Sequence, residues 1–108
     1  MNSREIWVKG EVAAREYLRA QGYRILEENF SGKMGEIDLI AEEHGQTVFV
    51  EVKSSLRLGD GAKRVDVKKI CHLRDAARAY IKQYGAEDCR FDILEESDAG
   101  FRLIKNAF

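Results

Sequence analysis

The chain has 108 residues, of which 18 are lysine or arginine and 19 are aspartate or glutamate, and its net charge is −1. This length predicts one domain, residues 1–108, with its own hydrophobic core. The apolar fraction of 44% and the charged fraction of 34% exclude a disordered chain. No apolar stretch could span a membrane, and the first residues lack the apolar segment of a signal peptide, so we expect a cytoplasmic protein without a membrane partner.

Periodicity predicts two helices and five strands. The first three strands are expected to form an antiparallel meander, and the second helix is expected to begin after Asp66 and to end at Gly85. The layout predicts an α/β domain with a mixed sheet flanked by helices, in the order α-β-β-β-α-β-β. The predicted elements are a helix over 4–21, strands over 23–29, 36–42 and 47–53, a loop over 54–64, a helix over 66–84, and strands over 90–95 and 101–104.

The hairpin of residues 36–53 has the most informative pattern. A turn centred on His44 and Gly45 pairs residues whose numbers sum to 89, which places Asp38 opposite Glu51. A shift by one residue would set valines against charged side chains and is disfavoured, whereas a shift by two stays open. Alternation predicts one apolar face that points to the core, formed by Ile37, Leu39, Ala41, Val48, Val50 and Val52.

The other face of this hairpin carries charged residues. Two carboxylates that face each other repel, so Asp38 and Glu51 indicate a cation between them, and first of all a divalent metal. Lys53 points to the same side as Glu51, where it can orient a water molecule or stabilise a charged transition state. The competing interpretation is an exposed sheet face with an inter-strand ion pair, which is the commoner meaning of a single E-x-K on a strand.

The loop over residues 54–64 follows Lys53 directly. Its two glycines, Gly59 and Gly61, predict a mobile segment with little apolar anchorage. It is either a flap that contacts a substrate or a plain connection.

Positive charge is concentrated around and after this loop. Nine basic and three acidic residues lie between Lys53 and Lys82, a charge of +6, against nine basic and sixteen acidic residues elsewhere, a charge of −7. Such a segment is compatible with a phosphate-binding side, and also with the solvated face of a helix.

Cysteine and histidine residues do not predict a metal site. Cys71 and Cys89 lie 18 residues apart without a second ligand pair, so we expect buried, reduced thiols. His44 and His72 lack metal-ligand spacing and are expected at the surface. Glu11 lies beside the apolar stripe of the first helix, where periodicity alone predicts a surface residue.

The motif G-E-I-D-L-I at residues 35–40, followed by V-F-V-E-V-K at residues 48–53, resembles the PD-(D/E)-x-K motif of nucleases with a restriction-endonuclease-like domain. The Pro-Asp of the general motif is absent, because Ile37 precedes Asp38. Nearly the whole chain resembles the YraN-like family of small bacterial proteins. That resemblance includes G-E-x-A-A at 10–14, G-Y-x-I-L at 22–26, Asn29, R-F-D at 90–92 and N-A-F at 106–108.

The resemblance implies a restriction-endonuclease-like fold, similar to that of archaeal Holliday-junction resolvases, and a site for Mg²⁺ or Mn²⁺. Asp38, Glu51 and the backbone carbonyl of Val52 would be metal ligands, joined by Glu11, and Lys53 would complete the catalytic set. The expected partner is DNA or another nucleic acid, and a homodimer is expected because a junction has two-fold symmetry. The expected phosphate contacts are Arg57, Lys63, Arg64, Lys68 and Lys69.

Three departures from the family pattern bear on function. Ser54 and Ser55 follow Lys53, and Ser31 stands where a basic residue is common, so positive charge near the site is reduced. Three hypotheses therefore stay open. The chain is a metal-dependent nuclease acting on DNA, branched or structured DNA included; a non-catalytic nucleic-acid-binding or adaptor protein; or a module that binds a partner through a sheet edge or Phe108.

Overall fold

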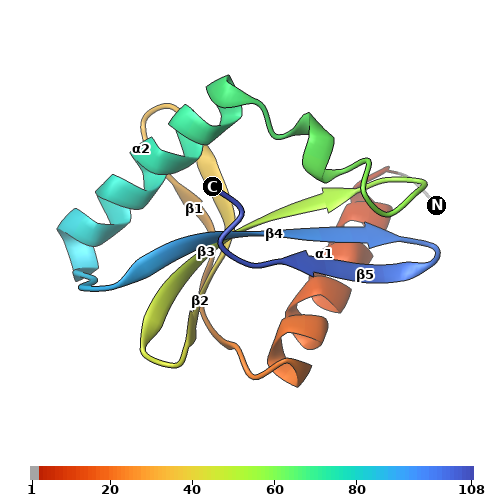
Figure 1. Ribbon diagram of the computed structural model, residues 1–108, viewed down its shortest axis with the longest axis horizontal. Coiled ribbons are helices and arrows are strands. Elements are labelled where there is room, and N and C mark those ends of the chain that lie inside the picture. The colour runs from red at the N-terminus through yellow and green to blue at the C-terminus, as the bar shows by residue number, and fades with distance from the viewer. Residues whose placement is uncertain (1–2) are drawn as a thin grey trace.

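The computed structural model describes residues 3–108, with side chains from residue 10 onwards. Two helices lie on opposite faces of a five-stranded sheet (Figure 1), which confirms the predicted α/β class. Neither of these helices is long and apolar enough to cross a membrane. The elements are α1 (Ser3–Ala20), β1 (Arg24–Ser31), β2 (Glu36–Glu43), β3 (Gln46–Ser54), the 3-10 helix η1 (Ala62–Arg64), α2 (Val67–Tyr84), β4 (Cys89–Ser97) and β5 (Gly100–Ile104).

The sheet is mixed, with the spatial order β1-β2-β3-β4-β5. β3 and β4 are parallel and every other neighbouring pair is antiparallel, so the first three strands form the predicted meander. Parallel neighbours need a crossover connection, and α2 provides it between β3 and β4. Asp66 caps α2, since its carboxylate accepts the Lys69 N–H at 2.9 Å, as the sequence predicts.

The register of the central hairpin is confirmed. Leu39 pairs with Val50 and Ala41 with Val48, so the residue numbers sum to 89. The turn has two residues, His44 and Gly45, with φ angles of 51° and 80°. Positive φ at both turn positions is the requirement of a type I′ hairpin, whose twist matches that of the strands.

Apolar side chains form one cluster on each face of the sheet, and one hairpin residue lies on the face opposite to its prediction. Alternation places Ile37 with Leu39, but Ile37 packs under α2 while Leu39 packs under α1. The β1–β2 connection bends towards α2 (Figure 1), and its glycines touch that helix closely. A Cβ atom on Gly32 would lie 2.7 Å from the Ala76 Cα, so the close contact holds this end of the hairpin against α2.

The two cysteines do not lie where the sequence predicted, and the terminal Phe108 packs within the domain. Cys71 and Cys89 are free thiols, but both are exposed, so their predicted burial is wrong. Cys71 lies outside the buried stripe of α2, and Cys89 is the first residue of β4. Phe108 stacks on Phe91 with ring centroids 4.9 Å apart, so the terminal aromatic ring packs within its own chain.

Candidate functional site

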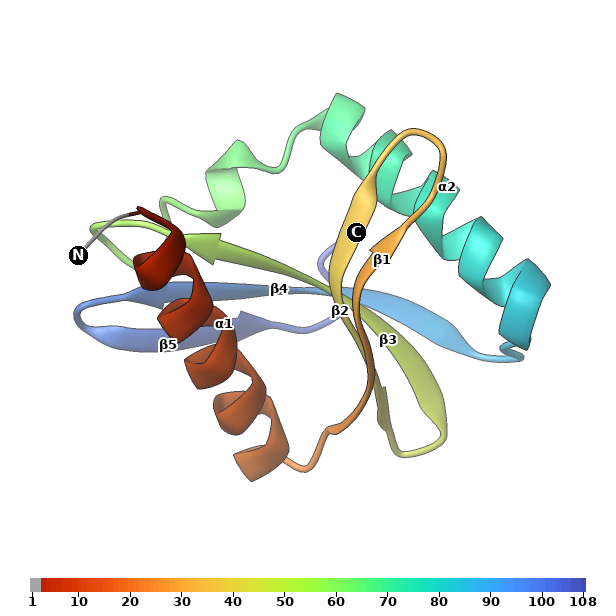
Figure 2. The ribbon, with the colours of Figure 1, turned by 180° about the vertical axis from the view of Figure 1, so that it is seen from behind.

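The two strands of the central hairpin separate where the charged residues begin. Backbone pairing of β2 and β3 ends at Leu39 and Val50, and beyond this point the strands diverge (Figure 2). Asp38 is the next residue, opposite Glu51 in the continued register. The Val52 N–H donates to the Asp38 carboxylate at 2.8 Å. A side-chain oxygen therefore accepts the N–H that faces β2, and the carboxylate is held between the strands.

Asp38 and Glu51 form an acidic pair in which Glu51 is buried and Asp38 is half-buried. Only 4% of the Glu51 side chain is exposed. Burial raises the pKa of Asp38 to about 8, and the adjacent Glu51 carboxylate adds to this rise, while the Val52 N–H and Lys69 oppose it. The pair lies in surroundings that disfavour two negative charges.

A cation already lies beside this pair, and it comes from α2. Lys69 Nζ is 3.2 Å from Glu51 Oε2. The contact is an ion pair by distance but not a hydrogen bond by geometry, because Glu51 Oε2 is buried without a hydrogen-bond partner. The sequence predicts Lys69 only as a phosphate contact. Its proximity to Glu51 depends on how α2 packs on the sheet.

The predicted catalytic lysine, Lys53, is half-buried on β3 and lies under the following loop. No side chain that the structure describes forms an ion pair with it. A Cβ atom on Gly61 would lie 2.8 Å from the Lys53 Cβ, so the loop backbone touches the base of this lysine. A glycine at position 61 lets the loop approach so closely.

The 54–64 loop is anchored by polar contacts that its sequence did not predict. Glu95, the neighbour of Lys53 on β4, is fully buried. Its carboxylate accepts the N–H groups of Gly59 at 2.8 Å and Ala62 at 2.7 Å, and the Arg102 guanidinium at 3.0 Å. Burial would raise the pKa of Glu95, but these donors outweigh burial and lower it. The loop lacks strong apolar anchorage, as predicted, yet it is held to the sheet by one carboxylate.

Replacing Glu95 by Ala should free this loop without unfolding the domain. We expect trypsin to cleave after Arg57 and Lys63 at least about tenfold faster, because two charge-assisted hydrogen bonds are lost. Mass spectrometry of the early fragments measures the rate at each bond. Glu87→Ala, at an exposed position, is the control. Equal acceleration after Arg78 on α2 would instead indicate general destabilisation.

Glu11 contacts Asn29 on β1 and does not complete a metal-binding group with Asp38 and Glu51. Asn29 Nδ2 donates to Glu11 Oε1 at 2.9 Å. Asn29 has a φ angle of 51° and lies opposite Asp38 in the β1–β2 register. Among the side chains described, from residue 10 onwards, no three His, Cys, Asp or Glu residues gather closely enough to hold a metal ion. The structure brings Asp38 and Glu51 together, and a metal-binding role for Glu11 stays a prediction.

The residues predicted to contact phosphate lie in the three segments that come after Lys53 in the chain. They run from the loop through η1 to the first turn of α2. Lys63 Nζ lies 3.6 Å from Asp60, and Arg64 donates to the Ser54 carbonyl. Both contacts are exposed, so these cations stay accessible to a ligand. The exposed members of the set are Arg57, Lys63, Arg64 and Lys68.

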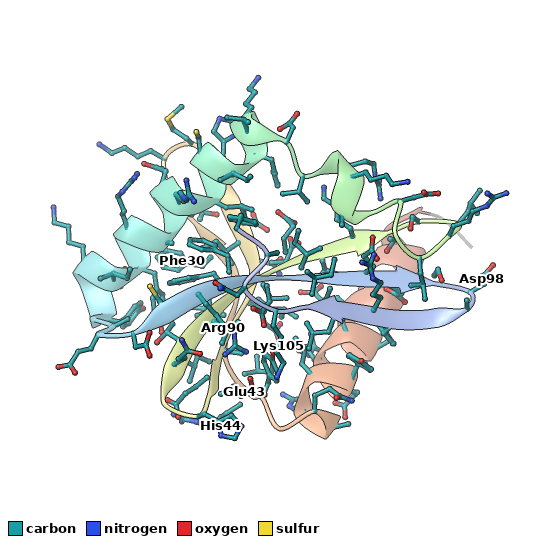
Figure 3. All side chains as sticks on the ribbon, in the orientation of Figure 1. Phe30, Glu43, His44, Arg90, Asp98 and Lys105 are labelled. Atoms are coloured by element: carbon teal, nitrogen blue, oxygen red, sulfur yellow. The ribbon has the colours of Figure 1, made fainter. Side chains whose placement is uncertain are left out.

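A second charged cluster lies at the turn end of the hairpin and was not predicted. The Arg90 guanidinium, whose side chain is 11% exposed, contacts Glu43 at 2.6 Å and Asp92 at 3.0 Å. Tyr23 donates to Asp92 at 2.7 Å, and Lys105 also pairs with Glu43 at 3.0 Å. Figure 3 shows Glu43, Arg90 and Lys105 side by side. Two cations match two carboxylates here, which indicates a structural role.

The comparisons with known proteins identify the family. The model of the Uncharacterised protein family UPF0102 matches residues 10–95. A UPF0102 protein of Caldicellulosiruptor saccharolyticus is 40% identical over 118 aligned residues, covering 100% of both chains. A UPF0102 protein of Persephonella marina is 42% identical, and the alignment covers 94% of both chains. A UPF0102 protein of Thermotoga neapolitana is 46% identical, and the alignment covers 87% of this chain and 89% of the relative. The chain therefore belongs to the UPF0102 family, which confirms the predicted resemblance to YraN-like proteins.

Proposed function

We propose that this protein is a metal-dependent nuclease that hydrolyses phosphodiester bonds in DNA, with a restriction-endonuclease-like fold. Branched or otherwise structured DNA is the substrate class to test first. The observation that carries the proposal is the acidic pair of the half-buried Asp38 and the buried Glu51, at the separating ends of β2 and β3. Glu51 Oε2 in particular is buried without a hydrogen-bond partner.

The residues present are compatible with a hard divalent cation. Magnesium is typically bound through one or two carboxylates and keeps several water molecules. Asp38 and Glu51 would hold it, with the Val52 carbonyl and Glu11 as further predicted ligands. A bound Mg²⁺ or Mn²⁺ would neutralise charge on the phosphate and lower the pKa of an attacking water.

The other residues of the site would position the substrate. Lys53 lies two residues from Glu51 on the same face of β3 and is half-buried, and its ammonium group would orient water or stabilise charge on the phosphate. In the reaction, a water oxygen bonds to phosphorus, the bond to the leaving oxygen breaks, and that oxygen takes up a proton. The exposed cations between Arg57 and Lys68 would hold the flanking phosphates.

The test is a nicking assay on linear, supercoiled and branched DNA with Mg²⁺ or Mn²⁺. Asp38→Asn and Lys53→Ala should each reduce the rate by about 10²-fold or more, because each removes a group that acts on the reacting phosphate. Lys82→Ala, at an exposed position near the end of α2, is the matched control. Activity that survives both site changes would come from another site or a contaminant, and would refute the proposal.

A non-catalytic nucleic-acid-binding or adaptor protein is the second candidate. Two observations favour it: Lys69 already provides positive charge beside Glu51, and no described third ligand joins the pair. The loss of positive charge where Ser54 and Ser55 follow Lys53, and at Ser31, points the same way. This candidate predicts DNA binding that weakens steeply with salt, without cleavage in any metal. Cleavage that depends on Asp38, or no binding at low salt, would exclude it.

A further inference from the structure

The contact between Lys69 and Glu51 raises the question of what happens to this lysine when a metal binds. Lys69 Nζ lies 3.2 Å from a carboxylate oxygen that a metal would also need. That oxygen is buried and has no hydrogen-bond partner, so the nearby charge of Lys69 is its one recorded polar contact. Two cations cannot share one buried oxygen without repulsion, since unit charges at such distances interact strongly where water is scarce.

We propose that Lys69 is the resident counter-cation of the Asp38–Glu51 pair, that a divalent metal displaces it, and that the displaced ammonium group then binds a DNA phosphate. The inference rests on the proposed function, because it concerns the metal and the substrate of the same site. It gives Lys69 a role distinct from that of the exposed lysines Lys63 and Lys68.

The position of Lys69 allows this movement without a change of fold. The backbone of Lys69 is fixed in the first turn of α2, where its N–H donates to the capping carboxylate of Asp66 at 2.9 Å. Its side chain is 34% exposed, so part of the flexible stem already reaches solvent. Rotation of this stem would carry the ammonium group away from Glu51 and into solvent.

Displacement would couple the two ligands. A metal that releases Lys69 adds one phosphate contact, and a phosphate that draws Lys69 away leaves Glu51 free for the metal. By linkage, each ligand must then strengthen the binding of the other by the same factor. When neither metal nor DNA is bound, Lys69 would neutralise the negative charge of the site.

The first experiment measures Mn²⁺ binding to the full chain without DNA, by electron paramagnetic resonance titration of free Mn²⁺. Lys69→Gln should bind Mn²⁺ at least about fivefold more tightly than Lys68→Gln. Both changes remove one positive charge from adjacent positions, so the comparison cancels long-range electrostatics. Equal affinities in the two variants would overturn the inference.

The second experiment measures the affinity for a short DNA duplex with and without Ca²⁺, used as a probe that replaces Mg²⁺. The gain in affinity caused by Ca²⁺ should be at least about fivefold in the wild type and in Lys68→Gln, and near onefold in Lys69→Gln. If Ca²⁺ increases the DNA affinity of Lys69→Gln as much as that of the wild type, the inference that the displaced Lys69 binds a phosphate is overturned.

Two further variants, Lys69→Arg and Asp38→Asn, distinguish a failure of the displacement proposal from a failure of the proposed function. Lys69→Arg keeps the charge and should weaken Mn²⁺ binding, since a guanidinium can pair with the carboxylate through two donors. It keeps the test valid if Lys69→Gln does not fold. Mn²⁺ binding that is lost in Asp38→Asn but equal in both glutamine variants refutes the displacement alone. If no variant binds Mn²⁺, or if Asp38→Asn binds it normally, the proposed function fails as well.

Discussion

Asp38→Asn should make the metal-free protein more stable at about pH 8, by about 1–3 kcal/mol, and should abolish stabilisation by Mn²⁺. The asparagine oxygen can accept the Val52 N–H that now bonds to Asp38 at 2.8 Å, and its amide carries no charge beside Glu51. The variant therefore keeps the geometry and removes the repulsion. Urea unfolding in a chelator, and then in Mn²⁺, measures both effects.

The pH dependence of this effect has a defined sign. The folded-state pKa of Asp38 is raised to about 8, against about 4 in the unfolded chain. The proton then stabilises the folded state, and this contribution is lost as the pH rises from about 4 through about 8. Because asparagine does not titrate, the stability difference between variant and wild type should grow over this window. A difference that stays constant would contradict the raised pKa. Asp98→Asn, in the exposed β4–β5 turn (Figure 3), is the control.

Arg90→Ala should cause the largest loss of stability, about 3–5 kcal/mol. The change leaves Glu43 with Lys105 alone and removes the guanidinium from Asp92, which is fully buried. Removing one partner of a buried ion pair strands the desolvated charge of the other. The free energy of unfolding from urea titration at about pH 7 measures this loss.

Arg24→Ala is the matched control for this prediction. Arg24 also pairs with a glutamate, Glu42, at 2.8 Å, but its side chain is 70% exposed. Exposed pairs contribute about 0–1 kcal/mol, so little stability should be lost. Similar losses in the two variants would show that burial does not determine the strength of these contacts. A smaller loss for Arg90→Ala at low pH is also expected, because Arg90 helps to lower the pKa of Glu43 and this contribution to stability is lost once Glu43 is protonated.

Local patterns predicted the elements and the hairpin register well. Alternation and a His44–Gly45 turn were enough to pair Leu39 with Val50, because a shift by one residue would have buried charges. No bound of α1, α2 or a strand differs from its prediction by more than two residues, whereas η1 lies in the segment predicted as a loop. The face of Ile37 could not be predicted, since it depends on the contact of the Gly32 segment with α2, far away in the sequence.

Only the part of the site that depends on local strand pairing could be predicted from the sequence. The opposition of Asp38 and Glu51 follows from the hairpin register, so the sequence is sufficient to identify it. The Lys69–Glu51 contact joins a helix to a strand, and the Glu95 contacts join a strand to a loop that precedes it by more than thirty residues. Periodicity does not predict such tertiary contacts, although Glu95 alternates with the apolar Phe91 and Ile93 on one face of β4, which was a signal that it is buried with partners.

A crystal structure of the wild-type protein soaked in Mn²⁺, with anomalous diffraction recorded at the manganese edge, tests the central claim most directly. The claim predicts one strong anomalous peak between the carboxylates of Asp38 and Glu51, with Lys69 Nζ moved away from Glu51. A peak elsewhere, or no peak while Lys69 remains 3.2 Å from Glu51, would contradict it.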